Sequence, residues 1–250
     1  MQVLKFGGSS VANADNMSKV VDIVTKAVDR DRTILVASAI SGCTDTLIKI
    51  GHLASQRDDS YKALIDELQH KHHEIIRNFL PLEKQDESKE VCDSLFDSLR
   101  SIAQGVFLLG ELSPTSLDAI QGFGELWSTK ILATKLASIG IATKWIDSRK
   151  IIRTVAKGDK NIVDIQKTYS RINEMVESNP ITQLFVLPGF IASDKQGRTT
   201  TLGRGGSDYT ASLLAVGCKA RILEIWTDVP GMMTSNPKVV PTARTIGNIS

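Results

Sequence analysis

The chain has 250 residues, a formal net charge of +2, 42% apolar residues and 23% charged residues. These values lie near the averages for globular proteins, so the composition excludes a disordered, collagen-like or coiled-coil chain. The balanced charge argues against nucleic-acid binding and against a polybasic membrane patch. No apolar run reaches the roughly 18 residues that a membrane span needs, and no signal peptide pattern is present, so we expect no membrane partner.

Strands and helices alternate along most of the chain. We expect strands at 2–6, 33–37, 141–146, 182–187 and 220–226, of which 33–37 reads as buried. Helices are expected at 14–29, 116–138 and 164–177, a further helix that opens at 203–208 and runs to about 216, and a β-hairpin within 191–202. Parallel strands need crossover connections, and helices supply them here. The pattern therefore predicts one α/β domain over residues 1–250, with a mostly parallel sheet covered on both faces.

Residues 44–107 interrupt this alternation and are expected to be mostly helical. Apolar stripes with helical period run over 61–79 and 91–106, and Pro81 with the charged segment 83–90 separates them. Two such stripes predict a helical hairpin over about 56–107. We expect this hairpin to pack on the core of its own chain.

The cysteines and histidines form no metal or disulfide pattern. The three cysteines are odd in number and widely spaced: Cys43, Cys92 and Cys218. We therefore expect free thiols and a reducing, cytoplasmic compartment. Three of the four histidines lie within residues 70–73, in a charged segment without the spacing of a zinc site. They are predicted to form a solvated helix face.

Glycine-rich or polar breaks follow three predicted strands, at 5–10, 38–44 and 202–208. In open α/β sheets, ligands bind at that edge. Gly7 and Gly8 permit close backbone approach and precede a helix, which favours an anion, and Lys5 adds a positive charge. A simple strand–helix turn with a surface lysine stays an alternative interpretation.

The segment Gly203–Asp208 carries a stronger signal. Three glycines surround Arg204, whose planar guanidinium suits a carboxylate or a phosphate, and Ser207 and Asp208 can cap the following helix. The spacing differs from that of the phosphate-binding P-loop and of the dinucleotide-binding loop. Glu125 would repel an anion, so it fits such a site only if it meets a cation, and otherwise it is a helix-surface glutamate.

Three segments, 5–12, 189–211 and 226–231, resemble the motifs of aspartokinases, which are members of the amino acid kinase family. They stand in the family order and the match reaches from residue 2 to about 246. The hairpin is similar to that of the bifunctional aspartokinase–homoserine dehydrogenases, which indicates the N-terminal kinase domain of that branch. The resemblance implies a three-layer αβα sandwich with a helical hairpin insertion.

The resemblance also implies a phosphotransferase that moves the γ-phosphate of ATP to the side-chain carboxylate of L-aspartate. The product is 4-phospho-L-aspartate, at the first step toward lysine, threonine, methionine and isoleucine. The residues expected to act in catalysis are Lys5, Gly8, Arg204 and Asp208. Those expected around L-aspartate are Ser38, Thr44, Glu125, Phe190, Arg204, Ser207 and Asp208. Those expected around ATP are Lys5, Gly7, Gly8, Ser9, Thr227, Asp228, Met233 and Lys238.

Elementary chemistry agrees with these roles. The aspartate side chain, with a pKa of about 3.9, is ionised at neutral pH and needs no general base. The site must align the reactants and neutralise charge on the phosphoryl group, which Lys5, the amides of Gly7 and Gly8, and Mg²⁺ on the phosphates would do. Arg204 would clamp the α-carboxylate, while Glu125 and Asp208 would hold the α-ammonium. No protein ligand is assigned to the metal.

Some positions depart from the family pattern. Ser9 replaces the usual threonine, Met233 stands where many members have tyrosine, and 236–238 reads Asn-Pro-Lys where many have Asp-Pro-Arg. Family members continue with a further helix and regulatory ACT domains, so the chain is expected to be a kinase domain truncated at its C-terminal end, from a homo-oligomeric protein. Two alternatives stay open: a catalytically incompetent ATP- and aspartate-binding fragment, and a kinase of the same fold acting on another carboxylate.

Overall fold

A parallel sheet forms the centre of the computed structural model, which describes residues 1–158, 160–227, 231–236 and 239–247. In the described residues its strand order is β3-β6-β2-β1-β9, and every neighbouring pair is parallel. The strands are β1 (Gln2–Phe6), β2 (Thr33–Ala37), β3 (Thr143–Trp145), β6 (Leu184–Pro188) and β9 (Ile222–Trp226). The predicted α/β class and the predicted strand positions are confirmed.

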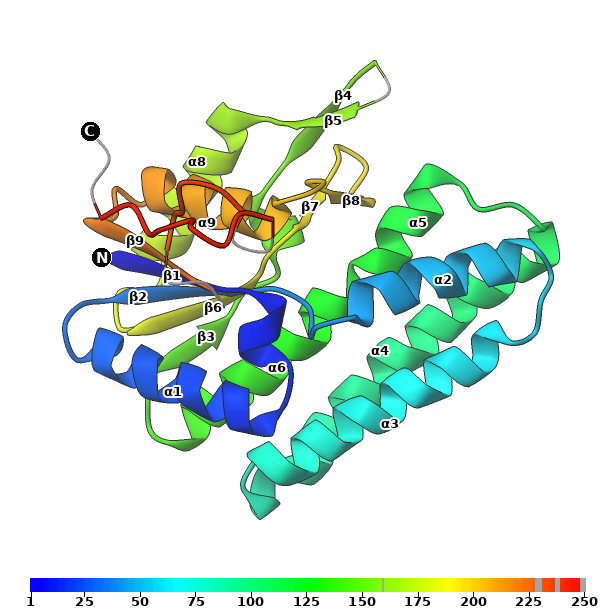
Figure 1. Ribbon diagram of the computed structural model, residues 1–250, viewed down its shortest axis with the longest axis horizontal. Coiled ribbons are helices and arrows are strands. Elements are labelled where there is room, and N and C mark those ends of the chain that lie inside the picture. The colour runs from blue at the N-terminus through cyan, green and yellow to red at the C-terminus, as the bar shows by residue number, and fades with distance from the viewer. Residues whose placement is uncertain (159, 228–230, 237–238, 248–250) are drawn as a thin grey trace.

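Helices cover both faces of the sheet, as Figure 1 shows. One face carries α1 (Ala14–Val28) and α6 (Phe123–Ser138), and the other carries α8 (Ile165–Glu177) and α9 (Gly206–Gly217). Every residue of β1, β2 and β6 is buried. Strands that are apolar on both sides require such double cover, so the three-layer αβα sandwich follows from their composition.

A helical bundle extends from one side of the sandwich (Figure 1). It consists of α2 (Cys43–Ser55), α3 (Tyr61–Phe79), α4 (Leu82–Leu109) and α5 (Pro114–Gln121). The predicted hairpin corresponds to α3 and α4, and Pro81 is the N-cap of α4. Its apolar stripes belong to the same core cluster as residues of β1 and β2, so the hairpin packs on its own chain as expected.

An aromatic stack joins the bundle to the sandwich. The ring of Phe96 on α4 lies on that of Trp127 on α6, with 4.0 Å between the ring centroids, and both side chains are fully buried. His72 on α3 packs against the same tryptophan, with 4.8 Å between centroids. Burial lowers the pKa of His72 to about 4. The prediction of a solvated histidine face is therefore wrong for His72, which is a neutral core residue bonded through Nδ1 to the Leu68 carbonyl.

Several elements differ from the sequence expectation. The single helix expected over 116–138 is two helices, because Gly122 lies against Ile191 and Thr199 at the junction, where an added Cβ would come within 3.2 Å of Ile191. The connection before α8 contains α7 (Ser148–Ile151) and a hairpin of β4 (Thr154–Lys157) with β5 (Lys160–Val163), none of which was predicted. The hairpin expected within 191–202 is present as β7 (Ile191–Ser193) and β8 (Thr199–Thr201).

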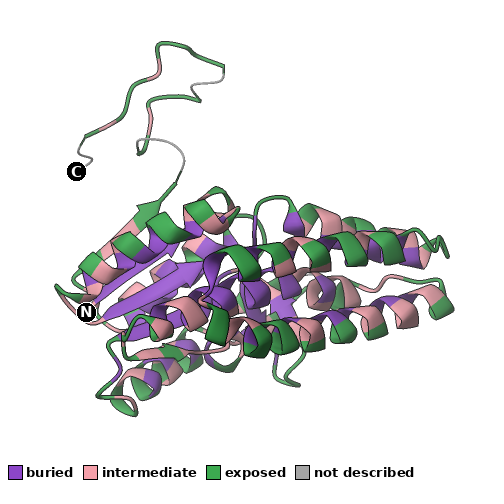
Figure 2. Cartoon of the chain, turned by 90° about the horizontal axis from the view of Figure 1, so that it is seen from below, coloured by how far each residue is buried: buried purple, intermediate pink, exposed green. Residues whose placement is uncertain are grey.

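The edge and the end of the chain are more exposed than the core. Ile222, Ile225 and Trp226 on the edge strand β9 are each between 39% and 49% exposed. Figure 2 shows the described residues that follow β9 lying away from the body. Among the described residues, no helix is long and apolar enough to cross a membrane, and no group of His, Cys, Asp or Glu has the geometry of a metal site. All three cysteines are free thiols, and burial raises the pKa of Cys43 and Cys92 to about 12.

Replacing Phe96 with alanine should lower the free energy of unfolding by about 3–5 kcal/mol, because the stack on Trp127 would become a cavity. Urea unfolding followed by circular dichroism measures this change. Leu109→Ala on the same helix is the matched control, since Leu109 is 78% exposed and its truncation should cost less than about 0.5 kcal/mol. Equal losses in the two variants would contradict the assigned role of the stack.

Candidate active site

A cleft of about 410 Å³ lies where β1, β2 and β6 end, at the carboxyl edge of the sheet. It brings together every residue predicted for catalysis or for L-aspartate: Lys5, Gly8, Ser38, Thr44, Glu125, Phe190, Arg204, Ser207 and Asp208. It also contains the three glycines that surround Arg204 and residues to which the sequence reasoning gave no individual role: Ala39, Ile40, Ser41, Gly42 and Asp45. Most of these lie in the breaks after strands that marked the edge, whereas Asp45 carried no sequence signal.

Lys5 and Asp208 connect two sides of the cleft. The Nζ atom of Lys5, at the end of β1, lies 2.7 Å from Oδ1 of Asp208 in the first turn of α9. The lysine side chain is 11% exposed and the aspartate side chain 47% exposed. The ion pair therefore holds a positive charge at the mouth of the cleft, where an entering anion would compete with the carboxylate for it.

The turn after β1 lies directly against the turn after β2. A Cβ on Gly8 would lie 2.8 Å from the carbonyl oxygen of Ala39, and the N–H of Ser41 donates to the Gly8 carbonyl at 3.2 Å. Only glycine fits this approach. The N–H of Gly7 donates to the carbonyl of Trp226 at 3.3 Å. The Gly7 amide was expected to face the ATP phosphates, but in this structure it is already hydrogen-bonded to the Trp226 carbonyl.

Glu125 is a buried carboxylate at the floor of the cleft. It is 3% exposed, and its Oε1 accepts a hydrogen bond from the N–H of Ala39 at 3.1 Å. Its Oε2 has no hydrogen-bond partner. Burial raises the pKa of Glu125 to about 8, although the bond from Ala39 acts in the opposite direction. The expectation of a helix-surface glutamate does not hold, and the free oxygen is suited to a positively charged ligand group.

The local sequence explains why Glu125 lies at the floor of the cleft. A Cβ on Gly124 would lie 2.6 Å from the Cβ of Ala39, so glycine lets α6 approach the turn after β2. Ser128, one turn further along α6, donates to the carbonyl of Ser38 at 2.8 Å. These contacts fix the first turn of α6 against the cleft, and Glu125 with it.

The loop before α9 presents Arg204 to solvent. Gly203 and Gly205 have φ angles of +72° and +74°, a left-handed conformation that favours glycine on both sides of the arginine. Arg204 is exposed, and no hydrogen bond or ion pair of its side chain occurs among the described residues. Helix α9 begins at Gly206 with Gly205 as N-cap and no side-chain cap, so the predicted capping by Ser207 and Asp208 is wrong.

Phe190 adopts a strained backbone at the end of β6. Its φ angle is +67°, and its N–H donates to Oγ1 of Thr210 at 3.1 Å. Two glycines lie close by. A Cβ on Gly206 would lie 2.8 Å from Phe190, and a Cβ on Gly189 would lie 2.6 Å from Ser207. A non-glycine residue in this conformation is typical of a ligand-binding position, because the surrounding contacts must stabilise the strain.

The residues predicted only for the nucleotide are not brought into the cleft. Gly7, Ser9, Thr227 and Met233 do not line it. Asp228 and Lys238 lie outside the described residues. The rings of Phe6 and Trp226 stack at 5.9 Å between centroids beside this region, and Met233 forms an isolated antiparallel bridge with Thr245. The predicted nucleotide contacts therefore stay predictions.

The charges of the cleft suit a ligand that carries both signs. Lys5 and Arg204 supply two cations, while Glu125, Asp208 and Asp45 supply carboxyl groups. No histidine lines this cleft, so no imidazole is available there as a general base. The arrangement can bind an anion and a neighbouring zwitterion in fixed relative positions.

Comparison with known proteins gives consistent matches over the whole chain. A model described as the amino acid kinase family matches residues 1–250. Lysine-sensitive aspartokinase 3 of Escherichia coli strain K12 is 34% identical over 261 residues, covering 99% of this chain and 53% of the relative. Bifunctional aspartokinase/homoserine dehydrogenase 1, chloroplastic, of Arabidopsis thaliana is 28% identical over 249 residues, covering 99% of this chain and 27% of the relative.

A solved structure matches equally well. The crystal structure of E. coli aspartokinase III in complex with aspartate and ADP superposes with a TM-score of 0.88 at 32% identity, over 98% of this chain and 53% of that one. This chain thus spans between about a quarter and about half of the length of these relatives.

Replacing Glu125 with glutamine should flatten the pH dependence of stability of the ligand-free protein. The carboxyl pKa rises from 4.5 to about 8 on folding. Between these values the native state keeps a proton that the unfolded chain releases, so the free energy of unfolding falls as the pH rises, by a few kcal/mol in total. Urea unfolding between about pH 5 and pH 8 measures the slope. The exposed substitution Glu90→Gln should keep the wild-type slope, and the same slope in all three proteins would contradict the buried carboxylate.

Proposed function

Because the chain belongs to the amino acid kinase family, we propose that it is the kinase domain of an aspartokinase. The proposed reaction is L-aspartate + ATP → 4-phospho-L-aspartate + ADP, the first step toward the aspartate-derived amino acids. The observation that carries the proposal is the buried Glu125, which has one oxygen without a hydrogen-bond partner and lines a cleft together with Lys5 and Arg204. Such a set suits the ammonium and carboxylates of a small amino acid beside a phosphate.

Each cleft residue has a defined part in this proposal. Arg204 binds the α-carboxylate of aspartate through its planar guanidinium. Glu125 and Asp208 bind the α-ammonium, whose charge also stabilises the ionised form of Glu125. The β-carboxylate of aspartate is the nucleophile and attacks the γ-phosphorus of ATP, and the bond to the ADP oxygen breaks. Lys5 stabilises the negative charge on the transferring phosphoryl group, and Gly8 lets the phosphates approach the backbone.

A magnesium ion fits this arrangement only as part of the nucleotide. Mg²⁺ prefers oxygen ligands and keeps several waters, using phosphates and at most a few carboxylates. Among the described residues no group of three or more His, Cys, Asp or Glu could hold a metal ion, and we propose that the ion is held by ATP oxygens. Bound there, it would withdraw charge from the phosphates. The protein's own contribution is then to place Lys5 and the glycine turn.

We also propose a cellular setting for the protein. Three free thiols are typical of a reducing compartment, and we propose the cytoplasm. From the family resemblance we propose that the full-length protein is a homo-oligomer. We also propose from it that this protein has ACT domains and belongs to the bifunctional branch. The second candidate function is an ATP- and aspartate-binding domain without turnover. Calorimetry that detects ATP and aspartate binding without any product would support this second candidate.

Lys5→Ala should lower kcat for aspartyl phosphate formation by about two orders of magnitude, because a charge contact to the transferring group is lost. Hydroxylamine trapping of the acyl phosphate measures the rate. Lys19→Ala is the control, since Lys19 is an exposed lysine on α1 away from the cleft. Near-normal turnover by Lys5→Ala would remove Lys5 from the mechanism.

Glu125→Gln should raise the KM for L-aspartate by about tenfold or more, because the ammonium loses a charged partner. Succinate has both carboxylates of aspartate but no ammonium, so the substitution should change its inhibition constant by less than about threefold. Glutamate is assayed in parallel, in the same coupled ADP assay, as the test of another carboxylate substrate. An equal weakening of aspartate and succinate would contradict the ammonium contact.

A further inference from the structure

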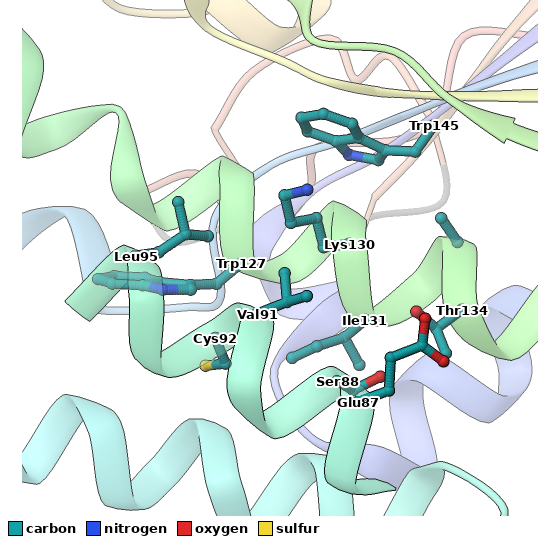
Figure 3. A pocket seen from close by; sticks show the side chains of 11 residues that line it. Glu87, Ser88, Val91, Cys92, Leu95, Trp127, Lys130, Ile131, Thr134 and Trp145 are labelled. Atoms are coloured by element: carbon teal, nitrogen blue, oxygen red, sulfur yellow. The ribbon is translucent and has the colours of Figure 1, made fainter. Parts of the chain in front are cut away.

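A second cavity, of about 160 Å³, lies between α4 and α6, beneath Trp145 of β3 (Figure 3). Its apolar wall consists of Val91, Leu95, Trp127, Ile131 and Trp145. Trp127 is two residues from Glu125 on α6, and positions two apart point to nearly opposite sides of a helix. The cavity and the candidate active site are therefore distinct sites served by the same helix.

The size and lining of the cavity are suited to one small ring. An apolar cavity of about 150 Å³ in another protein binds benzene, so a space of this volume accepts a single six-membered ring. Trp145 supplies the accessible aromatic surface of the cavity, the buried Trp127 lies behind its wall, and Figure 3 shows Val91 and Ile131 on the side opposite Trp145. Aromatic and branched aliphatic walls of this kind bind planar apolar groups through dispersion and the hydrophobic effect.

Two polar atoms in the wall lack partners. Trp127 is 0% exposed, and its Nε1 has no hydrogen-bond partner. Ser88 is buried as well, and its Oγ has no hydrogen-bond partner. Both atoms are buried, so a ring held in the cavity would not pair with them, and recognition depends on the apolar wall and on the charge at the mouth.

The mouth of the cavity carries a positive charge. Nζ of Lys130 lies 3.8 Å from the ring centroid of Trp145. Figure 3 shows this lysine beneath the indole ring. Burial lowers the pKa of the lysine. The nearby carboxylates are already engaged, since Glu87 pairs with Lys84 at 3.2 Å and Asp147 pairs with Arg149 at 2.7 Å. Lys130 has no ion pair of its own among the described residues, so it can receive an anionic group.

We propose that this cavity is a binding site for a small monocyclic aromatic carboxylate. The ring lies against Val91, Ile131 and Trp145, and the carboxylate remains at the mouth beside Lys130. The charge selects against amines of the same shape, and the volume excludes larger ring systems.

The same geometry connects the cavity to the active-site helix. Trp145 donates from Nε1 to Oγ1 of Thr129 at 3.0 Å, and Thr129 donates from Oγ1 to the carbonyl of Glu125 at 2.6 Å. A ligand in contact with Trp145 thus acts on the turn of α6 that holds Glu125. This coupling, which rests on the proposed aspartate site, predicts that occupancy changes the affinity for L-aspartate.

Calorimetric titration with phenylacetate tests the site itself. We expect a Kd below about 1 mM for phenylacetate and at least tenfold weaker binding of phenethylamine, which has the same ring and the opposite charge. Lys130→Gln should weaken phenylacetate about tenfold. Val91→Phe should abolish binding by filling the mouth, because Val91 is 41% exposed and lines the cavity.

Leu82→Phe, at an 81% exposed position on the same helix, is the matched control and should bind phenylacetate as the wild type does. No phenylacetate binding by the wild type, or undiminished binding by Val91→Phe with a wild-type unfolding curve, would overturn the proposed site. Self-association of the protein through this cavity, if Val91→Phe weakens it and phenylacetate does not, would overturn the proposed site as well.

Titration of L-aspartate with and without saturating phenylacetate tests the coupling. Occupancy should change the aspartate Kd by about fivefold or more in the wild type and should have no effect in Val91→Phe. An unchanged Kd would overturn the coupling. Because phenylacetate binding is measured without aspartate, a failure of the proposed aspartate site cannot be mistaken for a failure of this cavity.

Discussion

The close approach of α6 to the turn after β2 is the contact on which the candidate active site depends. Gly124 allows it, because any larger side chain would overlap Ala39. The approach brings the Glu125 carboxylate within hydrogen-bond distance of the Ala39 amide, and it brings Ser128 within reach of the Ser38 carbonyl. Because Gly124 has no side chain, α6 can contact the turn after β2 at the edge of the sheet. This contact places the Glu125 carboxylate at the floor of the cleft.

Burial at this junction leaves the Glu125 carboxylate without a counter-charge. Glu125 is held where its ionised form lacks a counter-charge, so its pKa is raised to about 8 until a cation arrives. Lys5 and Asp208 satisfy each other at 2.7 Å in the absence of ligand. An amino acid ligand would supply the ammonium that Glu125 lacks, and a phosphate would share Lys5 with Asp208. Under the proposed function, selectivity for a zwitterion next to an anion would follow from charges that are unpaired or exchangeable in this structure.

The sequence was sufficient for features that depend on periodicity and on strand ends. Buried strands identified the sheet, and the breaks after them identified the cleft that now contains Lys5, Glu125 and Arg204. It was insufficient where tertiary contacts decide the outcome. His72 has the sequence surroundings of a solvated residue, but α3 turns it toward Phe96 and Trp127. The β4–β5 hairpin is short and half-polar, so no period marked it.

The aromatic stack gives the helical bundle a role beyond cover for the sheet. Trp127 contacts Phe96 of α4, His72 of α3 and Phe123 of its own helix, so the position of α6 is fixed from the bundle side. Its opposite side is fixed by the turn after β2. A rigid helix held between two packed surfaces transmits a displacement at one of them to the other, because close-packed interiors do not absorb it. The bundle and the cleft therefore act on the same turn of α6, the one that carries Glu125.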